Sequence, residues 1–246
     1  MAGIEIINLK KSYQVEGREL PVLTGVNLEI PERQITVVLG RSGCGKTTLL
    51  RLTGGLERAD SGEIRYGGSH RTAFVFQEPR LMPWLTVRQN ILFGLRGREK
   101  KESGPRADEI IRTVGLEGFE KAYPSQLSGG MQQRTALARA LAYRPSFIMM
   151  DEPFAALDHF TREQMQRELL RVQRTEHCSI LFVTHSIDEA LLLGNKIVVI
   201  EKGKVKREFV LEEPGEERNL LDDRFIQLKR QVISDLNEHG EDLEIS

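Results

Sequence analysis

Apolar residues along the chain gather in short, β-branched runs that are separated by amphipathic segments. Six of these runs are candidate strands: 4–9, 35–39, 73–76, 147–150, 180–184 and 196–200. Several are apolar at nearly every position, which is typical of strands buried on both faces of a parallel sheet, and the intervening segments have helical spacing. The pattern therefore predicts an α/β fold.

Two regions depart from this alternation. The first, residues 1 to about 75, has strand-like runs separated by turn signals such as Glu16-Gly17 and only one obvious helix, so we expect an antiparallel β layer there. The second, residues 81–145, is almost entirely helical in pattern and is predicted to be an inserted α-helical subdomain. The remaining segments, 1–80 and 146–205, would then form the core of a single domain that spans 1–246.

The tail, residues 206–246, is charged and is predicted to end in a helix. Its apolar residues recur at helical spacing: Leu221, Phe225, Leu228, Val232 and Leu236. We expect this face to pack against the core, and binding of a partner is the alternative.

Composition limits the classes of protein to consider. With 246 residues, 39% of them hydrophobic, the chain can bury a substantial core, and its net charge of −1 creates no general attraction to nucleic acid or anionic lipid. Two cysteines, Cys44 and Cys178, are too few for a disulfide framework, which favours the cytoplasm. The N-terminus lacks a signal-peptide pattern, and no apolar run approaches the roughly 20 residues of a membrane span. If the protein works at a membrane, another chain must span it.

The stretch GRSGCGKT, residues 40–47, follows a predicted strand and precedes a predicted helix. Glycines in this context let backbone N–H groups surround an anion, and the helix N-terminus adds its positive dipole end. We expect Lys46 to reach the β- and γ-phosphates of a nucleotide and the Thr47 hydroxyl to bind Mg²⁺. A plain glycine turn, and a redox role for Cys44, are the alternatives. The predicted phosphate-binding residues are Gly40, Arg41, Ser42, Gly43, Cys44, Gly45, Lys46, Thr47 and Thr48.

The stretch FIMMDEP, residues 147–153, is a buried strand that ends in two carboxylates. Successive side chains of a strand point to opposite sides, so Asp151 and Glu152 can serve different atoms. Asp151 is the candidate for holding Mg²⁺, usually through water. Glu152 is the candidate catalytic base that polarises the attacking water, and capping of the following turn is its alternative role.

Two further polar residues follow apolar strands. Gln77 comes after TAFVF and could contact both Mg²⁺ and the attacking water; His185 comes after ILFVT and could sense the γ-phosphate, with a structural role as its alternative. Open α/β sheets bind ligands at the carboxyl ends of their strands, where all these residues are predicted. The remaining histidines are expected on the surface or in turns: His70, His159, His177 and His239.

A second glycine-rich stretch, LSGGMQQR at 127–134, holds no nucleophile or metal ligand. Ser128, Gly129 and Gly130 precede a predicted helix at 131–143, so we expect them to form a second anion nest with a second helix dipole. The chain already has one predicted phosphate-binding loop at residues 40–47, so the purpose of a second one must be explained.

Five motifs in order, GRSGCGKT, FVFQEP, LSGGMQQR, FIMMDEP and VTHS, make the sequence resemble the ATP-binding subunit of ATP-binding cassette (ABC) transporters over nearly its whole length. The resemblance implies a P-loop NTPase (RecA-like) core and a Mg²⁺-dependent ATPase with ATP and Mg²⁺ as its cofactors. In this family two copies stack head to tail, so Ser128, Gly129 and Gly130 of one copy would contact, in trans, the ATP held by the other. Hydrolysis would then let the two copies separate.

The resemblance also assigns roles outside the glycine loops. It implies that Tyr13 stacks on the adenine, with hydrophobic packing as the alternative, and that a loop with Ala155, Leu157 and Asp158 crosses the dimer interface. The sequence departs from the family at Ala155, where Ser is frequent, and at Ser186, where Asp is frequent. Both departures bear on coupling between the two nucleotide sites. The expected hairpin RYGGSHRTAF is also shorter than is usual in this family.

Longer stretches are similar to importers for nitrate, aliphatic sulfonates and taurine: EPRLMPWLTVRQNI, DEPFAALDHFTRE and VTHSIDEA. This similarity implies transmembrane permease subunits as partners, an indirect periplasmic or extracellular solute-binding protein, no nucleic acid, and a peripheral location on the cytoplasmic side of the inner membrane. Trp84 and Leu85 are candidates for receiving a permease helix, and burial in the helical subdomain is the alternative.

Other assignments remain open at the level of sequence. A thiamine-precursor importer would look similar. A soluble ABC switch that acts on nucleic acid or ribosomes commonly has two cassettes, a coiled-coil insertion or zinc-binding cysteines, and the sequence contains none of these. An exporter cassette usually shares a chain with its membrane spans.

Overall fold

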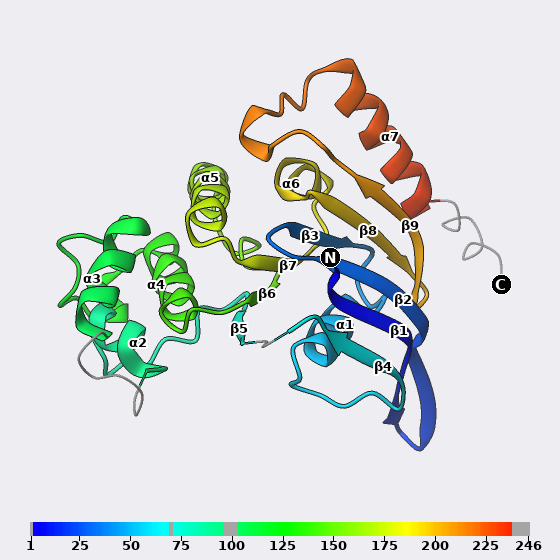
Figure 1. The fold of residues 1–246 in the computed structure, drawn as a ribbon, viewed down its shortest axis with the longest axis horizontal. Coiled ribbons are helices and arrows are strands. Elements are labelled where there is room, and N and C mark those ends of the chain that lie inside the picture. The colour runs from blue at the N-terminus through cyan, green and yellow to red at the C-terminus, as the bar shows by residue number, and fades with distance from the viewer. Residues whose placement is uncertain (1, 69–70, 96–102, 238–246) are drawn as a thin grey trace. The chain divides into compact units, whose positions relative to one another are not determined.

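The computed structural model describes residues 2–68, 71–95 and 103–237, which are distributed over two compact units (Figure 1). The first unit combines Met1–Gly68 with Leu181–Ser246, and the second is Ser69–Ile180. The predicted α/β class with an antiparallel layer and inserted helices is confirmed, and the helices expected at 81–145 lie in the second unit.

The first unit contains a three-stranded antiparallel sheet with the strand order β2-β1-β4. Its strands are β1 (Ala2–Val15), β2 (Arg18–Pro31) and β4 (Ser61–Tyr66). Glu16 and Gly17 join β1 to β2 with φ values of 50° and 77°, and two positive values suit a two-residue hairpin turn. The predicted hairpin RYGGSHRTAF is wrong, because β4 pairs with β1 whereas the next strand, β5 (Thr72–Val75), pairs with β6 (Phe147–Asp151).

A mostly parallel set of strands follows in the order β7-β3-β8-β9. Strands β3 (Ile35–Leu39) and β7 (Ser179–Thr184) are buried at every position, as their continuous apolar sequences predict. Strand β8 (Lys196–Glu201) pairs in parallel with β3 and antiparallel with β9 (Lys204–Val210). The sequence analysis did not predict β9, because this edge strand carries many exposed charges and lacks an apolar run.

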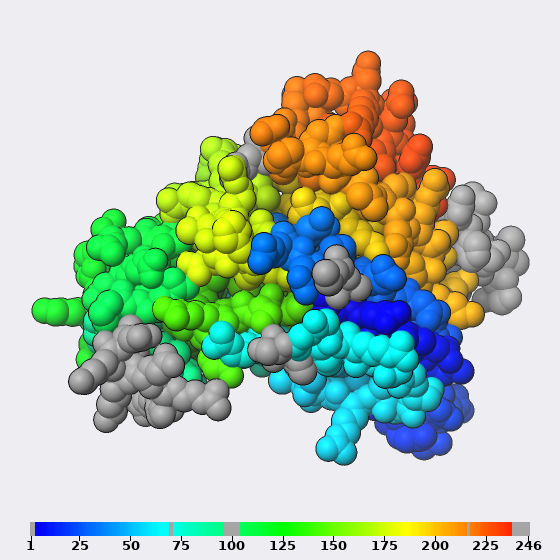
Figure 2. Space-filling view, in the orientation of Figure 1, coloured from blue at the N-terminus to red at the C-terminus, as the bar shows by residue number. Residues whose placement is uncertain are grey.

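The helices of the first unit are α1 (Lys46–Thr53), α6 (Ile187–Leu193) and α7 (Asp223–Asn237), with a short 3-10 turn at Gly215–Glu217. Helix α7 packs through Phe225 and Val232, which are buried, so core packing of this face is confirmed for these two residues. Leu221 was expected on the same face but precedes the helix and is 82% exposed. Figure 2 shows β9 and α7, in orange and red, packed against one another at the surface.

The second unit contains the parallel pair β5 (Thr72–Val75) and β6 (Phe147–Asp151). Its helices are α2 (Val87–Phe93), α3 (Ser103–Thr113), α4 (Gly129–Ala142) and α5 (His159–Glu176), with a 3-10 turn at Pro124–Gln126. Arg106 on α3 forms ion pairs with Glu109 and with Glu176, which ends α5. Over the described parts of both units, none of the helices combines the length and the apolar character needed to cross a membrane.

Candidate nucleotide-binding site

The first glycine loop lies between the buried strand β3 and helix α1. Gly43 and Gly45 have φ values of 80° and 104°, a left-handed conformation that residues with a side chain rarely adopt. At Gly40 there is no room for a side chain, because an added Cβ would lie 2.5 Å from the carbonyl oxygen of Ile200. Glycine at position 40 therefore allows the loop to pack against the end of the strand that contains Ile200, while the backbone at Gly43, with nothing within 4 Å of an added Cβ, is open to a ligand.

Lys46 places its ammonium group inside this loop. It is only 5% exposed, and Nζ donates hydrogen bonds to the carbonyl oxygens of Gly40 at 2.8 Å and Arg41 at 3.1 Å. The ammonium thus lies near the N-terminus of α1, where the helix dipole also favours an anion. Arg41, Ser42 and Gly43 are exposed, and Thr47 and Thr48 are half-buried.

Cys44 is half-buried in the same loop. Burial raises the pKa of its thiol, and the charge of Lys46 only partly opposes this effect. A thiol with a raised pKa stays protonated near neutral pH and is a poor nucleophile. The redox alternative for Cys44 is therefore not favoured.

Tyr13 extends from β1 toward α1. Its hydroxyl donates a hydrogen bond to Glu57 Oε2 at 2.5 Å. Burial is the larger cause, and the hydrogen bond to Glu57 the second, that raises the pKa of the Tyr13 hydroxyl. The hydroxyl is therefore protonated and acts as a donor at neutral pH. The ring is therefore held beside the helix that begins in the phosphate loop.

His185 is exposed at the carboxyl end of β7, and a buried polar network fixes the turn that carries it. The Thr184 hydroxyl donates to Glu189 Oε2 at 2.5 Å, while the backbone N–H groups of Ser186 and Glu189 donate to the hydroxyls of Thr184 and Ser186 at 3.0 and 3.3 Å. The sequence analysis missed Thr184 and Glu189. The spacing of Ser186 and Glu189, a helix-capping pattern, is the signal that could have identified the network.

The two other histidines within the described residues, His159 and His177, lie at the two ends of helix α5. His159 begins α5 with its side chain 74% exposed, 3.5 Å from Glu163 Oε1. His177 ends α5 with a left-handed φ of 51°. His70 and His239 lie outside the described residues.

In the second unit, two of the predicted metal and catalytic positions follow neighbouring strands. Val75 of β5 is paired with Met150 of β6. Gln77, two residues after β5, and Asp151, the last residue of β6, therefore both lie at the carboxyl end of this parallel pair. Glu152 has a φ of 44°, which is uncommon for a residue with a side chain, and such strain is concentrated at functional sites. The pair therefore carries amide and carboxylate oxygens at one edge.

Helix α4 holds the segment that follows β5. The amide of Gln133 is buried and donates to the Phe76 carbonyl oxygen at 3.1 Å. The guanidinium of Arg139 donates to the carbonyl oxygens of Pro79 at 2.9 Å and Arg80 at 2.8 Å, and burial lowers its pKa. Nothing in the local sequence pattern distinguishes these two side chains from ordinary polar positions, so the sequence analysis missed both.

The second glycine loop differs from the expected geometry. Helix α4 begins at Gly129, and Ser128 is its N-cap, with its hydroxyl accepting from the Met131 N–H at 3.3 Å. None of Ser128, Gly129 and Gly130 has a positive φ, so these residues form no nest. The anion-binding groups here would instead be the first-turn N–H groups of a 14-residue helix.

This helix N-terminus adjoins the predicted dimer-interface loop. A Cβ added at Gly130 would lie 2.5 Å from Thr161 Cγ2, and one at Gly129 would lie 3.8 Å from Leu157 Cδ2. Gly130 therefore allows close packing of α4 against the start of α5. The start of α4 and the loop before α5, which are both predicted to contact a second copy, are therefore adjacent within this unit.

The loop itself is held from α5. Asp158 caps this helix by accepting from the Thr161 N–H at 3.1 Å, and the Thr161 side chain, followed by this N–H, lowers the pKa of the Asp158 carboxyl group. Arg162 donates to the Leu157 carbonyl oxygen at 2.8 Å. Ala155 and Leu157 are half-buried and Asp158 is exposed.

The predicted site residues therefore fall into two groups, one in each compact unit. The first unit holds the phosphate loop with Tyr13 and His185. The second unit holds Gln77 and the carboxylates of Asp151 and Glu152. It also holds Ser128 at the start of α4 and the predicted dimer-interface loop that ends at Asp158.

Trp84 and Leu85 have different environments in the second unit. Trp84 is 68% exposed, whereas Leu85 is buried, so only Trp84 can contact a partner directly. Asn90, which is fully buried, accepts from the Met82 N–H at 2.8 Å and donates to the Leu85 carbonyl oxygen at 2.9 Å. The loop that presents Trp84 is thereby held to α2.

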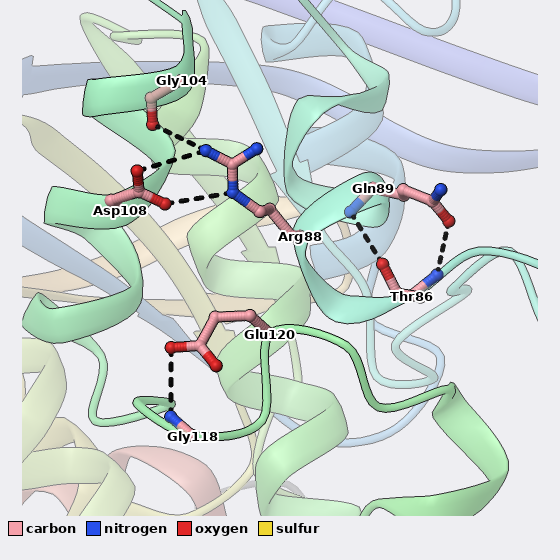
Figure 3. A network of polar contacts seen from close by, with 7 residues as sticks. All are labelled: Thr86, Arg88, Gln89, Gly104, Asp108, Gly118 and Glu120. Atoms are coloured by element: carbon pink, nitrogen blue, oxygen red, sulfur yellow. Dashed lines mark hydrogen bonds and ion pairs between the residues drawn. The ribbon is translucent and has the colours of Figure 1, made fainter.

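The start of α2 is further braced by the polar contacts in Figure 3. Thr86 and Gln89 form a reciprocal capping box. Arg88 forms an ion pair with Asp108 on α3 at 3.0 Å and also reaches the Gly104 carbonyl oxygen. In the same view, the Glu120 carboxylate accepts from the Gly118 N–H at 3.0 Å. Order in this region is therefore built from side-chain contacts as well as apolar packing.

Comparisons with known proteins agree on one family. A family model described as ABC transporter matches residues 23–155. The chain is 40% identical to the aliphatic sulfonates import ATP-binding protein of Bacillus subtilis, covering 96% of this chain and 94% of the relative. It is 39% identical to the nitrate import ATP-binding protein of a Synechocystis species, covering 93% and 89%. A solved dimeric ATP-binding cassette in a post-hydrolysis state, bound to ADP and Pi, is 33% identical with a TM-score of 0.75, covering 85% of this chain and 99% of that chain.

Proposed function

This chain belongs to the ABC transporter family, and from that premise we propose that it is the ATP-binding and ATP-hydrolysing subunit of an importer for a small anion, of the aliphatic sulfonate, nitrate or taurine class. The observation that carries this proposal is the near full-length similarity, at 40% and 39% identity, to subunits named for sulfonate and nitrate import. The cargo itself would be bound by the permease and a solute-binding protein.

The geometry of the phosphate loop supports ATP as the substrate. A buried ammonium, glycines without room for side chains and a helix N-terminus together favour a polyanion. Lys46 would neutralise the β- and γ-phosphates, and Tyr13, held beside α1, would stack on the adenine. The first-turn N–H groups of α1 would position the phosphates for attack.

Hydrolysis is assigned to the residues that follow the strands. Glu152 would accept hydrogen bonds from the attacking water and raise its nucleophilicity, and His185 would contact the γ-phosphate. We keep Thr47, Gln77 and Asp151 as proposed ligands of Mg²⁺, because hydroxyl, amide and carboxylate oxygens are the ligand types that this ion accepts. When bound, Mg²⁺ would neutralise charge on the phosphates.

A second copy of the chain is the proposed first partner. Ser128 and the first turn of α4 would contact the γ-phosphate held by the other copy, with Asp158 and its loop at the interface. The adjacency of Gly130 and Thr161 within one unit supports a shared contact surface for these two elements. The dimeric state of the similar cassette supports this arrangement.

The permease is the proposed second partner, and it would dock on the second unit. Exposed aromatic side chains flank the start of α2. Trp84 precedes the helix, and Phe119 and Tyr123 lie on a neighbouring segment. The backbone carbonyl groups of this segment accept hydrogen bonds from the first N–H groups of α2. The hydrogen bond from Val87 N–H to the Ala122 carbonyl, at 2.9 Å, joins the two segments. Exposed aromatics on a braced loop are typical of protein interfaces. Docking there would place the subunit peripherally on the cytoplasmic side of the membrane.

The test is a tagged pull-down from detergent-solubilised native membranes, with co-purifying chains identified by mass spectrometry. We expect a polytopic permease to co-purify with the tagged chain. The permease would lead to its solute-binding protein, and direct ligand-binding measurements on that protein would identify the cargo. Trp84→Ala should reduce permease capture while sparing ATP binding. Leu221→Ala, which removes an even more exposed apolar side chain from the first unit, should leave capture unchanged. Ribosomal proteins or nucleic acid in place of a permease would refute the importer role.

A further inference from the structure

The Tyr13 hydroxyl is tied through Glu57 to the last turn of helix α1. Glu57 accepts from the Tyr13 hydroxyl on Oε2 at 2.5 Å and from Arg51 NH1, in the last turn of α1, on Oε1 at 3.3 Å. One carboxylate therefore links the ring to the helix that begins in the phosphate loop.

Glu57 is itself held in place by its backbone neighbours. The N–H of Leu56 donates to the Arg51 carbonyl oxygen at 2.8 Å, so the segment starts directly from the end of α1. At its other end, the Asp60 carboxylate accepts from the Ser12 N–H on β1 at 2.6 Å. The carboxylate of Glu57 is thus positioned between the helix and the strand that carries Tyr13.

One face of the Tyr13 ring is already occupied by a charge. Lys11 Nζ lies 5.4 Å from the ring centroid and forms an ion pair with Asp60 at 3.0 Å. A cation over one face is attracted by the ring quadrupole and restricts which face a planar ligand can use. The ring is half-buried, so stacking would involve the face opposite to Lys11.

We propose that Glu57 is a positioning residue for the nucleotide base: its hydrogen bond to Tyr13 holds the ring in one orientation relative to the phosphate loop. This inference rests on the proposed ATP binding, with Tyr13 beneath the adenine. An unrestrained tyrosine in a half-exposed strand samples several rotamers, and binding to one of them loses affinity in proportion to its population. Ordering the ring before the ligand arrives removes that loss.

The test separates the base from the phosphates by comparing two ligands in calorimetric titrations. MgATP carries both groups, whereas magnesium tripolyphosphate carries only phosphates. Tyr13→Phe, which keeps the ring, and Glu57→Leu, which removes the acceptor at similar side-chain size, should each weaken MgATP binding by about two- to tenfold, the effect of one hydrogen bond. Neither should change the affinity for tripolyphosphate. Glu63→Leu, which removes an exposed carboxylate from β4, is the matched control and should change neither affinity.

A double-mutant cycle distinguishes positioning from support of the fold. In a Tyr13→Ala background no ring remains to be oriented, so Glu57→Leu should then have no further effect on MgATP. Equal weakening of both ligands, or the same effect with and without the ring, would show that Glu57 supports α1 and would overturn the proposal. Unchanged MgATP affinity in Tyr13→Phe and Glu57→Leu would also overturn it. Failure of the wild-type chain to bind either ligand would instead refute the proposed function.

Discussion

The buried amide of Gln133 offers a direct test of how helix α4 supports the segment around Gln77. Its Nε2 donates at 3.1 Å to the carbonyl oxygen of Phe76, the residue before Gln77, and its side chain is 2% exposed. Gln133→Met keeps an unbranched side chain of similar length and removes the donor. Gln132→Met is the matched control, because the neighbouring amide donates to the Pro124 carbonyl at 3.0 Å instead.

The magnitude follows from the loss of one hydrogen bond. Removing the donor while the Phe76 carbonyl stays at a half-buried position costs about 1–3 kcal/mol, toward the lower end of that range. Methionine recovers part of this loss through apolar contacts, because Gln133 lines a small cavity with Leu137 and Met150. We therefore expect Gln133→Met to lower the free energy of unfolding by about 1–2 kcal/mol in urea titrations. Gln132→Met should lower the free energy of unfolding by less, because Gln132 is only half-buried.

The functional assay is ATPase activity as a function of Mg²⁺ concentration. If Gln133 positions the Gln77 segment, Gln133→Met should raise the Mg²⁺ concentration for half-maximal activity by about tenfold, the equivalent of about 1.4 kcal/mol. Gln132→Met should leave it unchanged, and Gln133→Met should have no further effect on Gln77→Ala. An identical Mg²⁺ response in the two methionine variants, or fully additive effects with Gln77→Ala, would refute this reasoning.

Two further predictions concern stability and assembly. The hydroxyl of Thr36 is fully buried in β3 and has no hydrogen-bond partner among the residues that the structure describes, so Thr36→Val should raise the free energy of unfolding by about 1 kcal/mol, and a lower urea midpoint would contradict this expectation. If Glu152 is the general base, Glu152→Gln should accumulate an MgATP-dependent dimer in light scattering, and adding Ser128→Arg should abolish that dimer. Hydrolysis at the wild-type rate by Glu152→Gln would exclude this residue from the mechanism.

The sequence alone determined the parts of the site that depend on local order. A buried strand, a glycine loop and a helix follow one another within residues 35–53, so their spacing was enough to predict the glycine loop between β3 and α1. The positions of Asp151, the last residue of β6, and of His185, directly after β7, were likewise predicted from continuous apolar strands. These positions could be predicted because period, turn chemistry and strand ends act over a few residues, whereas the roles of the residues stay predictions.

Tertiary structure alone decided which distant side chains meet. Tyr13 and Glu57 are separated by 44 positions, and Gln133 and Phe76 by 57, so no local pattern indicated either hydrogen bond. The pairing of β4 with β1, and the exposure of Leu221 at 82%, likewise followed from long-range packing. Burial of a polar group is favourable only when a partner is present, and the fold, through contacts between distant segments, supplies that partner.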